Sequence, residues 1–344
     1  MKTIAALLLI AATASAIEWT DLRVKWKFWL LDPFHWSSYY QMPRTKADAI
    51  SNDWVEVSGL SSLDVTGMKT FALLLLITAV ASAIEWADLR VTSTYLGSDP
   101  LHKKSYFQMP RTKSDAINES WVEVTGLTSL NLTVYCFEEG DGRVCLEYDS
   151  YGNIAGIQAA VLCSDVENVQ SIYNRSNLNQ CQIKTIFDEQ YWTSTVYFIS
   201  PETIAAGGRS EMNGLTGTEG IWIRTTDGFI EIPRNVSEWD SAWTKEGCYS
   251  AEGIHYEYAM NSSMECTNLQ PWFLMEQGGE LSGFGLQGFG NTTYKTRDWY
   301  EHFAPNYFRE VIPTTPQCVI DLGNDYGFNS MHVFLTSEPY KYVC

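Results

Sequence analysis

The stretch 194–202 (STVYFISPE) returns in divergent form as 330–339 (SMHVFLTSEP), and this pair decides the fold. Upstream, a second match pairs 146–157 (LEYDSYGNIAGI) with 273–284 (FLMEQGGELSGF). Between the two matches, Cys181-Gln182-Ile183 resembles Cys318-Val319-Ile320. Because the order is shared, we infer an old internal duplication. Its two halves, 84–210 and 211–344, meet near residue 210.

Short runs of β-branched and aromatic residues predict strands in these copies. The Gly-Asp-Gly turn at 140–142 and the polar turn at 149–152 separate the strands of the first half. Residues 277–280 (QGGE) make the matching tight turn in the second half. The predicted strands of the first half are 132–137, 144–148 and 154–162.

One helix is expected in each half. Residues 165–173 have helical spacing in the first half, and residues 297–312 have it in the second, with an interruption at Pro305. We therefore predict a β-rich α+β fold of two divergent tandem repeats stapled by disulfides. Each repeat is a small antiparallel sheet with one packed helix, and the glycine-rich stretch 206–220 joins them.

Composition restricts the classes of partner. The chain has 344 residues, and 45% of them are hydrophobic, which is ample for a packed core. Its formal net charge is −18, so no basic surface is available to neutralise the phosphates of a nucleic acid. An anionic membrane surface repels such a chain for the same reason. We expect no nucleic-acid partner and no stable membrane anchor.

The N-terminus has the three parts of an export signal. Residues 1–16 hold a basic start, an apolar run and the small-residue site Ala14-Ser15-Ala16. The same signal recurs at 68–83, and the similarity extends on both sides at a constant spacing of 67 residues. Residues 17–67 thus form a partial duplicate of the segment that follows Met68. The chain is predicted to be secreted and extracellular.

Three interpretations of residues 68–83 stay open: a buried apolar helix, a second processing site, or the product of a partial gene duplication or a joined gene model. We favour a partial duplication or a joined gene model whose functional product starts at Met68. All eight cysteines lie after residue 83. Residues 1–83 hold seven acidic and seven basic residues, so the charge imbalance also lies later. The working protein is then 84–344.

Eight cysteines in an exported chain predict up to four disulfides, expected to form within the halves. The Cys-x-x-Cys spacing of a metal cluster is absent from the sequence. The cysteines are Cys136, Cys145, Cys163, Cys181, Cys248, Cys266, Cys318 and Cys344.

Six sequons predict N-linked glycans, and each places its asparagine at the surface if it is used. The asparagines are Asn118, Asn131, Asn174, Asn235, Asn261 and Asn291.

Standard catalytic motifs are missing from the sequence. The exception is Gly283-Phe284-Gly285-Leu286-Gln287-Gly288, which matches the dinucleotide fingerprint. That fingerprint opens a helix, whereas these residues continue an alternating aromatic strand, so we interpret them as strand. No cofactor is evident.

Histidine is the natural base near neutral pH. Of the histidines after residue 84, His255, His332 and His302 are the catalytic candidates, His255 and His332 foremost, and Glu257 or Glu301 can orient one. The alternative is that each is a partly buried structural residue. A metal site needs the fold to bring histidines together, which their spacing does not require, so we predict no metal ligand.

Aromatic side chains crowd the second half and either fill the core alone or also line a ligand pocket. The pocket candidates are Trp272, Phe284, Trp299 and Tyr256.

Two classes of function remain. The first is a secreted, N-glycosylated, disulfide-stabilised acidic protein that binds a small apolar or aromatic ligand or an extracellular protein. The second is a secreted enzyme without a standard motif, which oxidises a planar organic substrate with O₂ and no cofactor. A luciferase-like monooxygenase of a marine invertebrate is an example. There a histidine deprotonates the substrate in a dry aromatic pocket.

Overall fold

The computed structural model describes residues 23–25, 39–41, 84–92, 105–138, 140–302 and 304–344. The chain divides into two units, 1–82 and 83–344. In the first unit, strands β1 (Arg23–Lys25) and β2 (Tyr39–Gln41) pair antiparallel. The predicted export signals at 1–16 and 68–83 lie outside the described residues, so the interpretations of both segments stay predictions.

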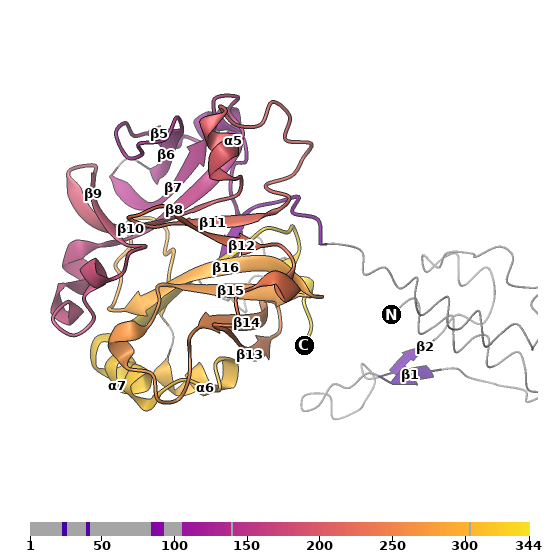
Figure 1. Ribbon diagram of the computed structural model, residues 1–344, viewed down its shortest axis with the longest axis vertical. Helices are drawn as coiled ribbons and strands as arrows, with labels where there is room; N and C mark the ends of the chain where they lie inside the picture. Colours follow the sequence, from indigo (N-terminus) through magenta and orange to yellow (C-terminus); the bar gives the residue numbers. More distant parts are fainter. Residues whose placement is uncertain (1–22, 26–38, 42–83, 93–104, 139, 303) are drawn as a thin grey trace, which may run out of the picture. The chain divides into compact units, whose positions relative to one another are not determined.

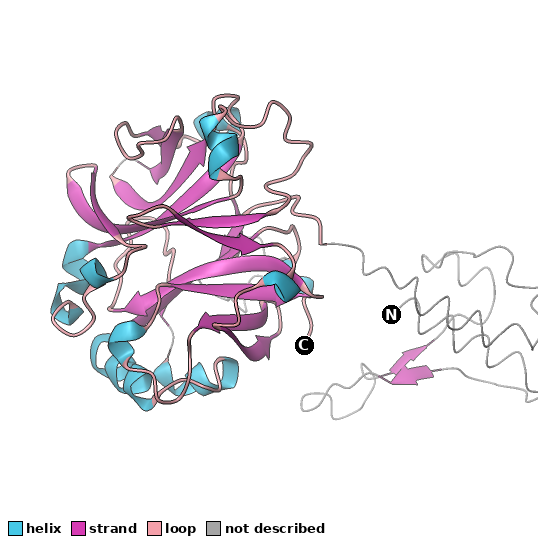
Figure 2. Ribbon diagram, viewed as in Figure 1, coloured by secondary structure: helices cyan, strands magenta, loops and turns pink. Residues whose placement is uncertain are grey.

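The second unit contains two eight-stranded antiparallel sheets (Figures 1 and 2). The first sheet has the order β12-β11-β10-β8-β7-β6-β5, with β9 also on β10. Its strands are β5 (Val122–Glu123), β6 (Thr133–Glu138), β7 (Asp141–Tyr148), β8 (Ile154–Leu162), β9 (Gln182–Ile186), β10 (Glu189–Tyr197), β11 (Gly220–Arg224) and β12 (Phe229–Pro233).

The second sheet has the order β13-β14-β15-β16-β18-β3-β4, with β17 also on β18. Its strands are β3 (Arg90–Thr92), β4 (Tyr106–Gln108), β13 (Trp243–Tyr249), β14 (Gly253–Tyr258), β15 (Trp272–Gln277), β16 (Glu280–Phe289), β17 (Glu301–His302) and β18 (Phe328–Phe334). The β-rich fold with two sheet-based repeats is confirmed.

The side chains between the two sheets form one core. Successive residues of a strand point to opposite faces of its sheet, so alternate residues of each strand contribute to this core. In β18, Met331 and Val333 belong to this core, together with Leu146 and Ile157 of the first sheet. His332 and Phe334 therefore point to the opposite face of the second sheet, which we call its outer face. Figure 1 shows α6 and α7 on that side, away from the first sheet.

Equivalent backbone bonds mark the repeat. The Phe198 N–H donates to the Ala155 carbonyl at the end of β10, and the Leu335 N–H donates to the Ser282 carbonyl at the end of β18. The neighbours of β10 and β18 in their sheets, β8 and β16, also correspond. The strands predicted for both copies are therefore found, in one common order.

The sheets do not coincide with the halves 84–210 and 211–344. The hairpin β11–β12 follows residue 210 but extends the first sheet beside β10. The hairpin β3–β4 extends the second sheet beside β18, although it comes from the start of the unit. Each central strand needs a partner for its free edge, and in each sheet this partner is a hairpin from the start of the other half.

The predicted helix at 297–312 is wrong. That stretch contains β17, a 3-10 turn at Pro305–Tyr307 and only a short helix, α6 (Phe308–Val311). In place of the helix predicted at 165–173, the structure has a 3-10 helix, Cys163–Val169, followed by a turn. The remaining helical segments are α4 (Lys113–Asn118), α5 (Pro201–Ala205), α7 (Gln317–Tyr326), and 3-10 turns at Arg175–Asn177, Val236–Glu238, Cys266–Asn268 and Pro339–Lys341.

Helix α7 also corrects one part of the duplication. It contains Cys318-Val319-Ile320, whereas Gln182 and Ile183 belong to strand β9. These two segments are therefore not structurally equivalent. The duplication holds for the sheet strands and not for the connections that cover them.

Three disulfides form within the predicted halves: Cys136–Cys145, Cys248–Cys344 and Cys266–Cys318. The prediction of a fourth is wrong, because Cys163 and Cys181 are free thiols. Cys181 is placed beside the Ser194 hydroxyl, with Sγ and Oγ 3.6 Å apart.

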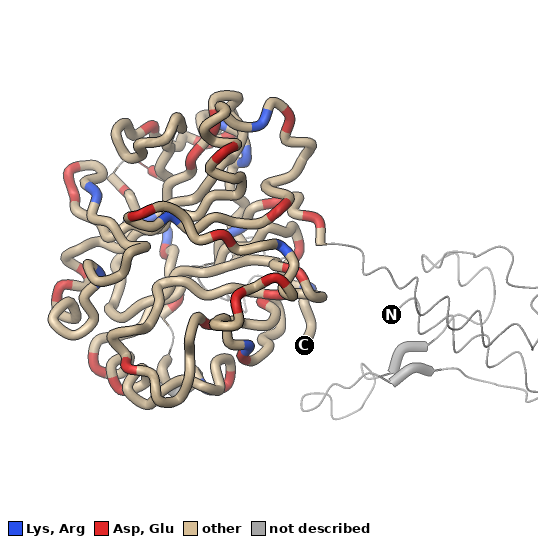
Figure 3. Tube along the Cα trace, viewed as in Figure 1, with Lys and Arg blue, Asp and Glu red and all other residues tan. Residues whose placement is uncertain are grey.

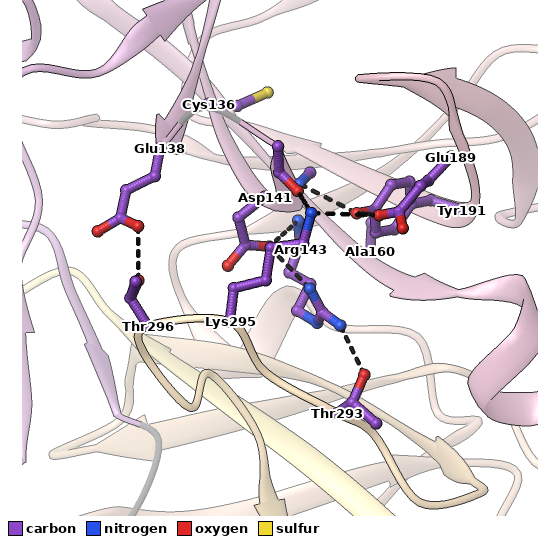
Figure 4. Close-up of polar contacts among 12 residues, drawn as sticks. Cys136, Glu138, Asp141, Arg143, Ala160, Glu189, Tyr191, Thr293, Lys295 and Thr296 are labelled. Atoms are coloured by element: carbon purple, nitrogen blue, oxygen red, sulfur yellow. Dashed lines mark hydrogen bonds and ion pairs between the residues drawn. The ribbon is translucent and has the colours of Figure 1, made fainter.

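A buried arginine joins the segment after β16 to the first sheet (Figure 4). Arg143 donates to the Asp141 carboxylate at 3.1 Å and to the Thr293 hydroxyl at 2.8 Å. The Asp165 carboxylate lies 3.7 Å from the same guanidinium. Lys295 donates to the Gly140 carbonyl. These contacts fix the segment that leads into β17.

Candidate functional site

The two foremost histidine candidates lie on one cavity at the outer face of the second sheet. We call this cavity the chamber. His255 of β14, His332 of β18 and Phe273 of β15 form its floor. Phe308 of α6 and Ile312, which directly follows α6, cover this floor. The chamber has a volume of about 170 Å³. Its lining residues are Tyr249, Glu252, His255, Glu257, Phe273, Gln287, Glu301, Phe308, Val311, Ile312, Phe328, Ser330 and His332.

The imidazoles converge on one carboxylate. Glu252 lies in the turn before β14, and its Oε2 is 3.4 Å from Nε2 of His255 and 3.6 Å from Nε2 of His332. The two rings are 5.8 Å apart between centroids, with an interplanar angle of 85°. On its other side, His332 presents Nδ1 to Oε1 of Glu301 at 3.7 Å. Glu301 was predicted from the sequence to orient a histidine, and in the structure it lies beside His332.

Burial sets the protonation of these groups. It lowers the pKa of His255 to about 4, and burial together with the neighbouring His255 lowers the pKa of His332. Burial raises the pKa of Glu252 to about 8. Burial and the charge of Glu252 raise the pKa of Glu301. Burial therefore disfavours the charged forms of both the imidazoles and the carboxyl groups at the chamber.

Several polar atoms at the chamber have no hydrogen-bond partner within the described part of the chain. They include Nε2 of His255, Nδ1 of His332 and Oε1 of Glu301. His255 is 2% exposed and His332 is 5% exposed. Buried polar groups are almost always paired in folded proteins, so unpaired ones that face a cavity need an explanation.

The floor depends on a glycine of β16. Phe273 stacks on His255 at 5.5 Å and meets His332 edge-on at 4.9 Å between ring centroids. Gly285 pairs with both Phe273 and His332, and a Cβ there would lie 1.9 Å from the Phe273 ring. The glycine pattern at 283–288 is thus strand, as predicted, and its central glycine makes room for the aromatic ring.

Glu257 and Gln287 form the polar wall. The Gln287 amide donates to Oε2 of Glu257 at 2.7 Å. Burial raises the pKa of Glu257 well above its usual range, although this hydrogen bond opposes the shift. Three carboxyl groups, from Glu252, Glu257 and Glu301, therefore border the chamber.

The remaining candidates lie elsewhere. His302 is exposed, and its Nε2 lies 3.8 Å from Asp298. Phe284 and Trp299 are completely buried in the core between the sheets. Tyr256 packs edge-on against Trp239 at 4.9 Å.

Trp272 borders a second, open groove of about 580 Å³ near β12 and β13. Its aromatic lining also includes Trp239, Trp243 and Tyr258. The four predicted pocket aromatics therefore do not line the chamber.

Sequence reasoning missed Glu252, Phe273, Phe308 and Ile312. Glu252 lies between Ala251 and Gly253, both with positive φ (75° and 100°), in a turn whose shape brings its carboxyl back over β14. Neither the spacing between Glu252 and His255 nor the residue types around Glu252 mark it as a site residue in the sequence. The apolar roof residues have no signal beyond being hydrophobic.

The sequence predicts a net negative charge and six surface asparagines, and the described part of the chain agrees with both. Figure 3 shows acidic residues spread over the second unit, with Lys and Arg fewer. No helix among the described residues is long and apolar enough to cross a membrane. All six sequon asparagines are exposed, as a glycan requires: Asn118, Asn131, Asn174, Asn235, Asn261 and Asn291.

Comparison with known proteins found no relative. No family model matches the chain, no curated protein is similar to it, and no solved structure matches it.

Proposed function

We propose that the chain is a secreted, N-glycosylated protein that binds a small, ring-sized organic ligand in the chamber. The observation that carries the proposal is an apolar roof set over two buried imidazoles, His255 and His332, that have polar atoms left unpaired. Three disulfides and six exposed sequon asparagines support the secreted part.

Size and chemistry restrict the ligand. An apolar cavity of roughly 150 Å³ takes up benzene, so a chamber of about 170 Å³ accepts one ring with a small substituent. Phe273, Phe308 and Ile312 suit a flat apolar body. The imidazoles suit a hydroxyl group, while the three carboxyl groups disfavour an anion. A neutral phenol meets all of these conditions.

The test compares phenol with toluene, which has nearly the same shape and no hydroxyl. Binding is measured by calorimetry and by shifts of the histidine ring protons. Phenol is expected to bind roughly tenfold more tightly than toluene, because one hydrogen bond to a buried group distinguishes them. His332→Phe should abolish this difference, and the matched variant His302→Gln should retain it.

Two outcomes would overturn the proposal. One is the absence of phenol binding up to its solubility limit. The other is binding that His332→Phe leaves unchanged while a bulky Ile312→Trp also fails to block it. Near-UV circular dichroism verifies that both variants fold.

The second candidate is turnover of the bound ring by O₂. The observation that favours it is the apolar roof, Phe308 and Ile312, which keeps water from an intermediate formed at the imidazoles. O₂ is the oxidant and accepts the electrons that the ligand loses. An oxygen electrode distinguishes the two candidates, because consumption of O₂ with phenol as the only added substrate supports the enzyme, and its absence supports binding alone.

A further inference from the structure

The distances at the chamber floor match those around a metal ion. Two ligand atoms about 2.1 Å from a common ion lie roughly 3.4 Å apart when the coordination is tetrahedral. Oε2 of Glu252 lies 3.4 Å from Nε2 of His255 and 3.6 Å from Nε2 of His332. The ligand atoms of these three residues all lie within 4.8 Å of one another. We propose that Glu252, His255 and His332 bind a divalent first-row transition-metal ion.

The unpaired imidazole nitrogen is an independent observation. Nε2 of His255 is buried, has no hydrogen-bond partner among the described residues, and lies next to the Glu252 carboxyl group. A buried polar atom without a partner costs free energy. A bound ion removes that cost, because the nitrogen lone pair then has a ligand bond.

Glu301 lies where it can accept a hydrogen bond from His332 without binding the metal ion itself. A histidine that binds a metal through one ring nitrogen almost always donates the other N–H to a carboxylate, a carbonyl or water. Nε2 of His332 faces Glu252, and its Nδ1 faces Oε1 of Glu301 at 3.7 Å. Glu301 is therefore a positioning residue that fixes the ring tautomer.

The site is open on one side. Two imidazoles and one carboxylate leave at least one coordination position, and the cavity lies beside the three residues. This is the pattern of a catalytic rather than a closed structural metal site. Water or the hydroxyl of a ring-shaped ligand fits the free position. The inference uses the same chamber as the proposed function, but the ion binds whether or not an organic ligand does.

The experiment uses the secreted full-length protein after removal of metals with a chelator. Zn²⁺ binding is measured by calorimetry, and Co²⁺ binding by its visible spectrum, with no organic compound present. We expect one ion per chain, with Co²⁺ bands of four- or five-coordinate N/O ligation. Glu252→Gln and His332→Gln should each weaken binding more than about 100-fold. Glu301→Gln should weaken it roughly 10- to 100-fold.

Two controls separate this site from other donors. His302→Gln leaves binding unchanged, since that imidazole is exposed and outside the chamber. Cys163→Ser with Cys181→Ser also leaves it unchanged, which excludes ligation by the free thiols. Failure to bind Zn²⁺ or Co²⁺, or equal binding by Glu252→Gln, would overturn the metal site. The phenol comparison in chelated protein tests the organic ligand separately, so either proposal can fail alone.

Discussion

Replacement of the buried Glu147 by glutamine should stabilise the protein at alkaline pH and not at acidic pH. Glu147 of β7 points away from the core and is completely buried. The Tyr197 hydroxyl donates to it at 3.3 Å. Burial raises its pKa to about 7, although the charges of Lys184 and Arg224 oppose the shift. The folded protein therefore holds a proton that the unfolded chain has lost.

The sign follows from the direction of the shift. A carboxyl group with a raised folded-state pKa contributes its full stability below its ordinary pKa of 4.5, and loses it as the pH rises through about 7. A folded-state pKa of about 7, against the ordinary value of 4.5, corresponds to about 3 kcal/mol. Glutamine has nearly the same shape and does not ionise. The free energy of unfolding of Glu147→Gln relative to wild type should thus rise by about 3 kcal/mol between pH 4.5 and pH 8.5.

Urea unfolding of both proteins without reductant, at pH 4.5 and pH 8.5, measures this difference. The exposed Glu231→Gln serves as the control and should show no such pH dependence. A Glu147→Gln variant that is equally destabilised at both pH values would refute the argument, because Glu147 would then be ionised and paired in the folded protein.

Three further predictions concern the disulfides and the chamber floor. Thiol titration of the unfolded, unreduced protein should find two free thiols per chain, Cys163 and Cys181, and a count of zero would contradict the structure. Replacing Cys248 and Cys344 by serine should lower the free energy of unfolding by about 5 kcal/mol, because their disulfide closes a loop of 96 residues. The same change at Cys136 and Cys145, which are nine residues apart, should lower it by about 3 kcal/mol. Equal losses in urea unfolding would argue against an effect of loop entropy. Gly285→Ala should displace the Phe273 ring and lower both the melting temperature and phenol affinity, and a variant with unchanged binding would show that the floor does not need this glycine.

The sheet strands were predictable because their signal is local. The alternating runs and the Gly278–Gly279 turn, with φ of 67° and 89°, fix hairpins between neighbouring segments. The exchange of hairpins was not predictable, because pairing of β3 with β18 joins segments more than two hundred residues apart. Such long-range pairing leaves no pattern in either segment.

The helix errors have a physical cause. Aromatic residues within 297–312 recur at helical spacing, yet Tyr300 lies in a bend directly before β17, and its hydroxyl donates to the Ala160 carbonyl of the first sheet. A tertiary contact thus overrides the local pattern. Helix α7 was missed although Pro316 precedes it and Gly327, with φ of 88°, ends it, and both are ordinary boundary signals.

The candidate site was predictable only in part. His255 and His332 could be named from the sequence because a histidine in a strand of an aromatic-rich half is a rare titratable group. That the two histidines lie close together could not be predicted, because β15 and β16 lie between β14 and β18 in the sheet. Glu252 joins them only through the positive-φ turn at Ala251 and Gly253. Long-range register and turn geometry, rather than residue type, create this site.

The most direct measurement of the central claim is an anomalous difference map from crystals of the Zn²⁺-loaded protein, with data collected on both sides of the zinc absorption edge. The account predicts one strong peak about 2 Å from Oε2 of Glu252 and from Nε2 of His255 and His332, beside the chamber. A fully loaded protein whose zinc peak lies at any other residues, with the floor of the chamber free of metal, would contradict it.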